Sequence, residues 1–209
     1  MTSSELIRVM SVDDHRLMRE GITRILALQP DISVVAVAAS GQEAIDEYRR
    51  HRPDVTLMDL QLSGLSGLGA IRTIRQEYPD ARIVVLTMYS GDEDVFRALE
   101  AGAVGYVLKD TIPEDLIRVI RQVHAGGRPL SPDIAAVLDG RRGQAALTPR
   151  ELQVVQLLAS GMRDKEIAAE LNISQRTAQV HIRSVFRKLK VHDRTAALAV
   201  AVKRGIIRL

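Results

Sequence analysis

The chain has 209 residues, 46% of them hydrophobic and 3% aromatic, with a formal net charge of +3 and no cysteine. This composition indicates an ordinary globular protein with an aliphatic core, and it excludes a disulfide framework and a metal site built on thiolates. The longest apolar runs, VVAVAA and AALAVAV, fall far short of the roughly 20 residues that span a bilayer, so we expect a cytoplasmic protein without a membrane segment.

Five short runs rich in β-branched residues alternate with segments of helical periodicity over the first 126 residues. The runs are LIRVMSV, ISVVAVAA, VTLM, RIVVLT and VGYVL. Strands that alternate with helices favour a parallel sheet with helices on both faces, because the connections between parallel strands are right-handed. We therefore predict an α/β fold, a doubly wound five-stranded parallel sheet, for residues 1–126.

The pattern changes after this segment. The stretch RPLSPDIAAVLDGRRGQAA is rich in Pro, Gly and Arg, which predicts a linker over residues 127–146 with one helical turn capped by Ser131. Residues 147–209 contain no strand signal, and their periodicity predicts four helices, at about 149–160, 164–171, 175–189 and 193–204. Thr148 and Glu151 form a capping box at the first of these helices. We expect a small all-α domain here.

Charge is divided unevenly between the two parts of the chain. Residues 1–126 carry 14 Lys/Arg and 19 Asp/Glu, a net charge of −5, whereas residues 127–209 carry 15 and 7, a net charge of +8. A basic domain next to an acidic one indicates that the two parts bind different partners, and the basic part is suited to nucleic acid.

Polar side chains follow four of the five predicted strands. Asp13 and Asp14 follow the first strand, Asp59 the third, Thr87 the fourth and Lys109 the fifth. Because ligands bind at the carboxyl ends of parallel strands, we expect these groups to converge. Three carboxylates need a cation, and an all-oxygen site suits Mg²⁺. The alternative is local: Asp13 caps the following helix and Asp59 caps a loop.

Residues 6 to about 125 resemble the receiver domain of two-component response regulators. The positions that carry the resemblance are Asp13, Asp14, Asp59, Gln61, Thr87, Tyr106 and Lys109. It implies that a histidine kinase phosphorylates Asp59. It further implies that an acidic cluster, formed by Asp13, Asp14 and Asp59, binds Mg²⁺ together with the Gln61 carbonyl. It also implies that Thr87 and Lys109 contact the phosphoryl group and that Tyr106 moves with the switch. The chain departs from the family at Leu62-Ser63, where Met-Pro is usual.

A phosphatase of the haloacid dehalogenase type is a competing interpretation, because those enzymes also use an aspartate nucleophile at a strand end. They need a second aspartate two residues later as general acid. This chain has Gln61 there, so we expect no enzymatic activity of this kind.

The segment DKEIAAELNISQRTAQVHIRSVFRKL, residues 164–189, reads as two helices joined by a short turn at Asn172. On the second helix an apolar stripe is expected to face the core, formed by Ala178, Ile182, Val185 and Leu189. The opposite face is basic, which is typical of a helix-turn-helix whose second helix enters the major groove. Basic helix faces also occur where a helix only contacts water. The alternative to DNA binding is therefore a helical domain that binds another protein.

Residues 147–208 resemble the four-helix DNA-binding domain of LuxR type that occurs in NarL/FixJ-type response regulators. The motifs are LTPRE, LLASGMRDKEIAAELNIS, RTAQVHIRSVFRKLKV and DRTAALAVAVKRGII. By position, the resemblance implies base contacts from Gln179, Val180 and Arg183. It implies contacts nearer the DNA backbone from Lys165, Arg176, Thr177, His181 and Arg187. Two departures are Gln179 in place of Lys and Lys190 in place of Gly.

The last predicted helix is small and apolar along much of its length. Ala197, Val200 and Ala201 are expected to contact a second copy, as the resemblance suggests, so that a homodimer binds paired half-sites. Together these observations predict a transcription regulator whose binding to double-stranded DNA is switched by phosphorylation of Asp59.

Overall fold

The computed structural model describes residues 6–88, 91–130, 134–135 and 147–207. The chain divides into two compact units, an N-terminal one that contains the strands and a C-terminal one made of helices. The predicted turn capped by Ser131 lies outside the described residues. No helix of the described part is long and apolar enough to span a membrane.

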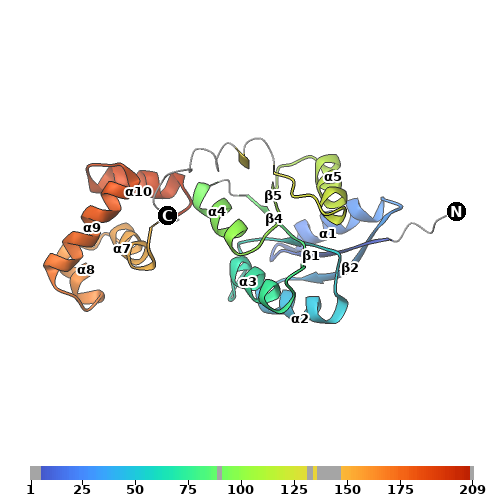
Figure 1. Cartoon of the computed structure of the whole chain (residues 1–209), viewed down its shortest axis with the longest axis horizontal. Helices are drawn as coiled ribbons and strands as arrows, with labels where there is room; N and C mark the ends of the chain where they lie inside the picture. Colours follow the sequence, from blue (N-terminus) through green and yellow to red (C-terminus); the bar gives the residue numbers. More distant parts are fainter. Residues whose placement is uncertain (1–5, 89–90, 131–133, 136–146, 208–209) are drawn as a thin grey trace. The chain divides into compact units, whose positions relative to one another are not determined.

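The N-terminal unit alternates strands and helices as predicted (Figure 1). Its strands are β1 (Ile7–Val12), β2 (Ile32–Ala38), β3 (Val55–Met58), β4 (Ile83–Thr87) and β5 (Gly105–Leu108). Its helices are α1 (Arg16–Ala27), α2 (Gly41–His51), α3 (Gly67–Glu77), α4 (Asp92–Glu100) and α5 (Pro113–His124). Every strand pair is parallel, in the order β2-β1-β3-β4-β5, which confirms the predicted five-stranded α/β fold.

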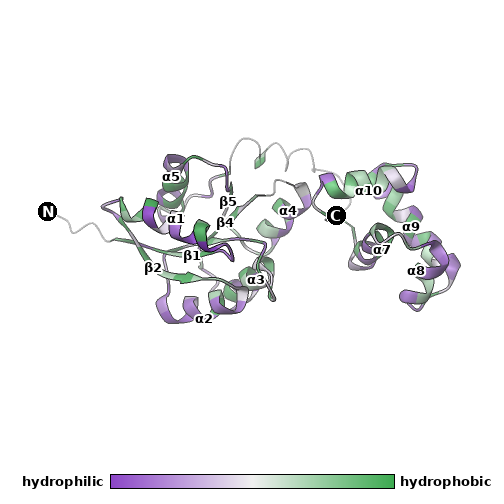
Figure 2. Ribbon diagram, turned by 180° about the vertical axis from the view of Figure 1, so that it is seen from behind, coloured by the Kyte–Doolittle hydropathy of each residue, from purple (hydrophilic) through white to green (hydrophobic). Residues whose placement is uncertain are grey.

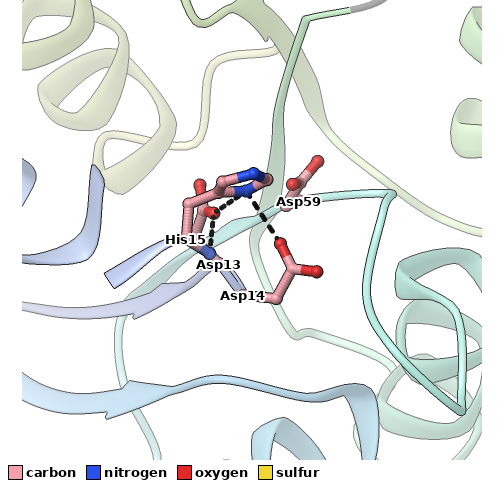
Figure 3. A group of neighbouring side chains, drawn as sticks. All are labelled: Asp13, Asp14, His15 and Asp59. Carbon is pink, nitrogen blue, oxygen red and sulfur yellow. Dashed lines mark hydrogen bonds and ion pairs between the residues drawn. The ribbon is translucent and has the colours of Figure 1, made fainter. Parts of the chain in front are cut away.

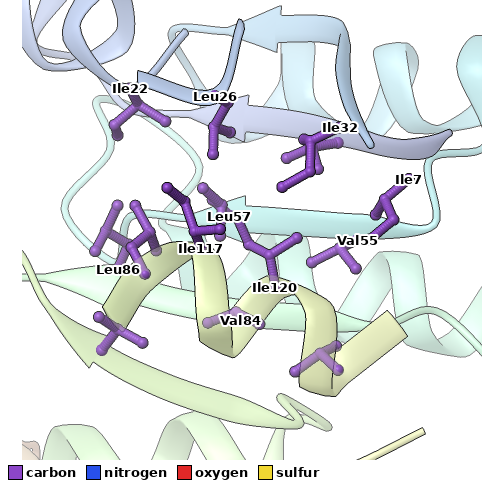
Figure 4. Close-up of a cluster of buried hydrophobic side chains, with 14 residues drawn as sticks. Ile7, Ile22, Leu26, Ile32, Val55, Leu57, Val84, Leu86, Ile117 and Ile120 are labelled. Atoms are coloured by element: carbon purple, nitrogen blue, oxygen red, sulfur yellow. The ribbon is translucent and has the colours of Figure 1, made fainter. Parts of the chain in front are cut away.

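Helices cover both faces of this sheet. On one face α1 and α5 bury aliphatic side chains against the strands, including Leu26 and Ile120, which are fully buried beside Leu57 of β3 (Figure 4). Helices α2 and α3 lie on the other face (Figure 1). Each buried aliphatic side chain contributes about 1.5–3 kcal/mol through the hydrophobic effect, so the layers hold the strand ends in fixed positions.

The C-terminal unit consists of α7 (Pro149–Ala159), α8 (Asp164–Glu170), α9 (Gln175–Leu189) and α10 (Arg194–Lys203). These helices agree with the predicted bounds to within one residue. The expected stripe on α9, formed by Ala178, Ile182, Val185 and Leu189, is buried in the core of the unit. The predicted capping box of Thr148 and Glu151 is present at the start of α7.

Helix α9 is delimited by specific residues at both ends. The Ser174 hydroxyl accepts a hydrogen bond from the Thr177 backbone N–H, and the preceding turn contains Asn172 at φ 51°. The helix ends at Lys190, whose φ of 57° and ψ of 45° are left-handed. This backbone conformation is one that glycine adopts without cost, so the chain places a lysine where its side chain introduces strain.

Candidate functional site

The carboxyl ends of β1, β3 and β5 bring three of the predicted polar residues into one buried group. Because β1 pairs with β3, Asp13 and Asp59 follow adjacent strands, and their exposed fractions are 1% and 2%. The Lys109 Nζ atom lies 2.7 Å from Oδ2 of each aspartate, and its side chain is 4% exposed. Sequence reasoning therefore identified residues that meet in space although up to 96 positions of sequence separate them.

Lys109 remains a cation in this buried position. Burial alone would lower the pKa of its ammonium, but the hydrogen bonds and charges of Asp13 and Asp59 outweigh burial and raise that pKa above its ordinary value. The ammonium consequently neutralises part of the negative charge of the two carboxylates and is positioned next to any group that Asp59 accepts.

The local capping alternative holds only for one oxygen of each aspartate. Asp13 Oδ1 accepts a hydrogen bond of 2.9 Å from the His15 backbone N–H, and Asp59 Oδ1 accepts one of 3.1 Å from the Gln61 backbone N–H. Helix α1 itself has no side-chain cap. The second oxygen of each carboxylate faces Lys109, so local hydrogen bonding does not account for the cluster.

Thr87 is fully buried, and its Oγ1 has no hydrogen-bond partner among the described residues. A buried hydroxyl without a partner is costly, and this residue ends β4, the strand next to β3. A phosphoryl oxygen on Asp59 would satisfy such a hydroxyl, so the residues present fit the group that the resemblance implies. Tyr106 is 1% exposed on β5.

Asp14 and His15 lie next to Asp13 in the cluster (Figure 3) and are more exposed than the two buried aspartates. The Nδ1 atom of His15 lies 2.9 Å from Asp14 Oδ1 and 3.5 Å from Asp13 Oδ1. One ligand atom from each of Asp13, Asp14, His15 and Asp59 lies within 4.8 Å of the others. Such a cluster is consistent with metal binding. His15 was not among the residues predicted for the site, although it directly follows the acidic pair.

The loop that follows Asp59 depends on a glycine. At Gly67 an added Cβ would lie 1.9 Å from the Asp59 carbonyl oxygen, and the Gly67 N–H donates to the Leu60 carbonyl at 3.2 Å. Leu62 is 9% exposed, so it anchors this segment where the usual Met-Pro pair is absent. The main chain next to Asp59 is therefore packed closely against the start of α3.

The eight residues predicted to contact DNA are all accessible on the C-terminal unit. Lys165, Arg176, Thr177, Val180, Arg183 and Arg187 are exposed, whereas Gln179 and His181 are half-buried. Val180 is 58% exposed, so its side chain is accessible for a contact. The Thr177 hydroxyl lies 2.8 Å from that of Ser174, so it already takes part in the cap of α9.

A buried network ties α9 to α7. Glu151 Oε1 accepts a hydrogen bond of 2.8 Å from the Ser184 hydroxyl, and Oε2 accepts bonds from Lys188 Nζ at 2.6 Å and from the Thr148 N–H at 2.7 Å. Burial alone would raise the pKa of Glu151, but these hydrogen bonds lower it to about 2. Arg187 in turn donates to the Ser184 hydroxyl at 3.2 Å. Sequence reasoning found only the capping box in this network.

The structure corrects the predicted dimer surface on α10. Ala197 and Ala201 are 2% and 0% exposed and belong to the core of their own unit. They therefore offer no surface to a second copy. Val200 is half-buried and packs against the same core. The helix is apolar along much of its length (Figure 2), and a periodicity argument does not separate surface that faces the core from surface that faces a partner.

Comparisons with known proteins agree with this arrangement. Residues 9–121 match the family of response regulator receiver domains, and residues 145–201 match the luxR family of bacterial regulatory proteins. An acidic strand-end cluster on a five-stranded parallel sheet, followed by a helix-turn-helix unit, defines a DNA-binding two-component response regulator, and this chain belongs to that class of proteins. Within the class it is of the NarL/FixJ type.

The similar proteins match over nearly their whole length. The nitrate/nitrite response regulator protein homolog of Haemophilus influenzae is 42% identical, over 91% of this chain and 94% of its own. The nitrate/nitrite response regulator protein NarP of Escherichia coli is also 42% identical, over 94% and 95%. The structure of RcsB from Salmonella enterica serovar Typhimurium bound to promoter P1flhDC in the presence of phosphomimetic BeF₃⁻ is 27% identical, with a TM-score of 0.72 over 94% of this chain and 98% of that one.

Proposed function

We propose that Asp59 accepts a phosphoryl group from the phosphohistidine of a sensor histidine kinase. A carboxylate oxygen of Asp59 attacks phosphorus, a P–O bond forms as the P–N bond breaks, and the histidine nitrogen leaves with the electron pair. The observation that carries this proposal is the group formed by Asp59, the Lys109 ammonium 2.7 Å away and the buried, unpartnered hydroxyl of Thr87.

Each residue of this group has a separate task in the proposal. Lys109 remains charged and neutralises the oxygens of the incoming phosphoryl group. The Thr87 hydroxyl donates a hydrogen bond to one of them and so gains the partner that it lacks. Mg²⁺, held by Asp13, Asp14, Asp59 and the Gln61 carbonyl, would supply the positive charge that offsets the charge on the transferring group.

Phosphorylation is proposed to act through the strands that carry these residues. A phosphoryl group adds about 1.5 to 2 negative charges to Asp59. Thr87 ends β4, and Tyr106 is buried on the adjacent β5, so a movement of the Thr87 side chain changes the packing around Tyr106. Packed cores respond by switching between discrete arrangements, and this response would alter the surface of the receiver.

We propose that the C-terminal unit reads double-stranded DNA through α9. Arg183 is suited to guanine, Gln179 to adenine and Val180 to a thymine methyl group. The exposed basic residues Lys165, Arg176 and Arg187 are suited to phosphates, together with Thr177 and His181. A homodimer of the phosphorylated protein would bind paired half-sites, and the exposed part of α10 that includes Val202, 39% exposed, is available for its interface.

Two measurements test this proposal. Incubation with a small phosphodonor and Mg²⁺ should label the protein and leave Asp59→Asn unlabelled, whereas labelling of both would place the phosphoryl group elsewhere. Binding to a promoter fragment should weaken steeply with salt, because each phosphate that the protein neutralises contributes a slope of about −0.9 in log–log form. Binding that does not depend on salt would favour a unit that contacts another protein. Turnover of phosphate esters would indicate the phosphatase alternative.

A further inference from the structure

The acidic cluster contains one histidine nitrogen that an all-oxygen magnesium site does not need. His15 follows Asp14 directly, and its Nδ1 lies 2.9 Å from Asp14 Oδ1 and 3.5 Å from Asp13 Oδ1 (Figure 3). The imidazole nitrogen therefore lies beside two carboxylates, although the side chain as a whole is 75% exposed.

These separations match those of ligands that share one ion. For bonds of about 2.1 Å in octahedral geometry, adjacent ligand atoms are about 3.0 Å apart and opposite ones about 4.2 Å apart. The two distances from His15 Nδ1 lie at and slightly above the first value, and the four ligand atoms all lie within 4.8 Å of one another. The remaining differences would be closed by rotation of His15 and of the half-buried Asp14, because Asp13 and Asp59 are held in the core.

The type of ligand determines which ion benefits. Mg²⁺ prefers carboxylate, carbonyl and water oxygens, whereas imidazole is a good ligand for first-row transition ions, whose affinities also rise along the series from Mn²⁺. We propose that His15 is a further metal ligand and that it makes this receiver favour a first-row divalent ion such as Mn²⁺ over Mg²⁺ more strongly than its carboxylates alone would. This inference rests on the metal site of the proposed function.

The His15 side chain can bind a metal ion without loss to the fold, because it does not cap the following helix. His15 precedes α1 at the N-cap position, but its side chain makes no capping hydrogen bond. The backbone N–H that donates to Asp13 Oδ1 is present whatever the side chain. His15→Ala should therefore leave both the fold and the position of Asp13 intact.

Pulsed electron paramagnetic resonance of the full chain loaded with Mn²⁺ tests the proposal directly. The wild-type protein should show coupling of Mn²⁺ to a ¹⁴N nucleus, which His15→Ala should lose and His192→Ala, a matched change of an exposed histidine in the other unit, should keep. Calorimetric titrations with Mn²⁺ and with Mg²⁺ should give an affinity ratio that falls about tenfold in His15→Ala, the lower end of the range by which residues that support metal ligands change affinity.

The outcomes separate this inference from the proposed function. Mn²⁺ bound without ¹⁴N coupling, or an affinity ratio unchanged in His15→Ala, would overturn the role of His15 while leaving the carboxylate site intact. Binding of neither ion, or binding unaffected by Asp13→Asn, would contradict the metal site itself and the inference with it.

Discussion

Removing the charge of Glu151 should destabilise the DNA-binding unit by an amount that the structure sets. The pKa of Glu151 is about 2, against an ordinary value of 4.5, and each unit of difference corresponds to about 1.36 kcal/mol. The folded carboxylate is thus favoured by about 3 kcal/mol. Because its pKa is lowered on folding, this stability is complete above pH 4.5 and is lost as the pH falls from 4.5 toward 2.

Glu151→Gln should therefore lower the free energy of unfolding by about 3 kcal/mol at pH 7. It removes the carboxylate from the ion pair with Lys188, whose side chain is 17% exposed. The difference in the free energy of unfolding between wild type and Glu151→Gln should shrink by about 1 kcal/mol at about pH 3.5, where the carboxyl group of the unfolded chain is protonated. Glu170→Gln, a change of an exposed glutamate on α8, serves as control and should have little effect.

Urea unfolding followed by helical circular dichroism measures this effect on the full chain. All four tyrosines lie in residues 1–126, so tyrosine fluorescence reports the N-terminal unit separately and should be unchanged. Equal stability of Glu151→Gln and Glu170→Gln at pH 7, or a difference that stays constant down to about pH 3.5, would refute the reasoning about the buried network.

Three further changes have defined outcomes. Lys190→Gly should raise the stability of the C-terminal unit by up to about 1 kcal/mol in urea unfolding, because it removes a side chain from a left-handed position; lower stability would contradict this. Ser184→Ala, introduced alone, should weaken DNA binding and reduce its salt dependence, because Ser184 orients Arg187. Introduced into Arg187→Ala, it should cause no further loss of DNA binding, and additive losses would refute the coupling. Thr87→Val should raise the stability of the unphosphorylated protein by about 1 kcal/mol, because it removes a buried hydroxyl without a partner. It should also weaken the binding of beryllofluoride, measured by calorimetry, because that hydroxyl is proposed to contact the phosphoryl group. A destabilised variant with normal beryllofluoride binding would refute both expectations.

The acidic cluster was predictable because it depends on strand order alone. Parallel strands end at one edge of the sheet, so Asp13 and Asp59 had to approach one another once β1 was placed beside β3. Lys109 follows β5, two strands from β3, and its long side chain reaches both carboxylates along the same edge. The left-handed end of α9 at Lys190 was predictable for a different reason: the feature is local, and the sequence motif identifies the position where a glycine is usual.

Contacts between helices were not predictable in the same way. Ser184 and Lys188 reach Glu151 across 33 and 37 positions, and nothing in the periodicity of α9 identifies a partner on α7. The error at Ala197 and Ala201 has a related cause, since small apolar residues are equally suited to the core of one unit and to a contact between two. His15 was overlooked because an exposed histidine next to two aspartates carries no periodic signal.

The central claim is that phosphorylation of Asp59 controls DNA binding, and selection of genomic DNA fragments by the purified protein tests it most directly. The protein should be compared with and without a phosphodonor and Mg²⁺, with Asp59→Asn in parallel. We predict fragments that are enriched only with the phosphodonor and only by the wild-type protein. Equal enrichment in all three samples would contradict the claim, because the receiver would then act without phosphate.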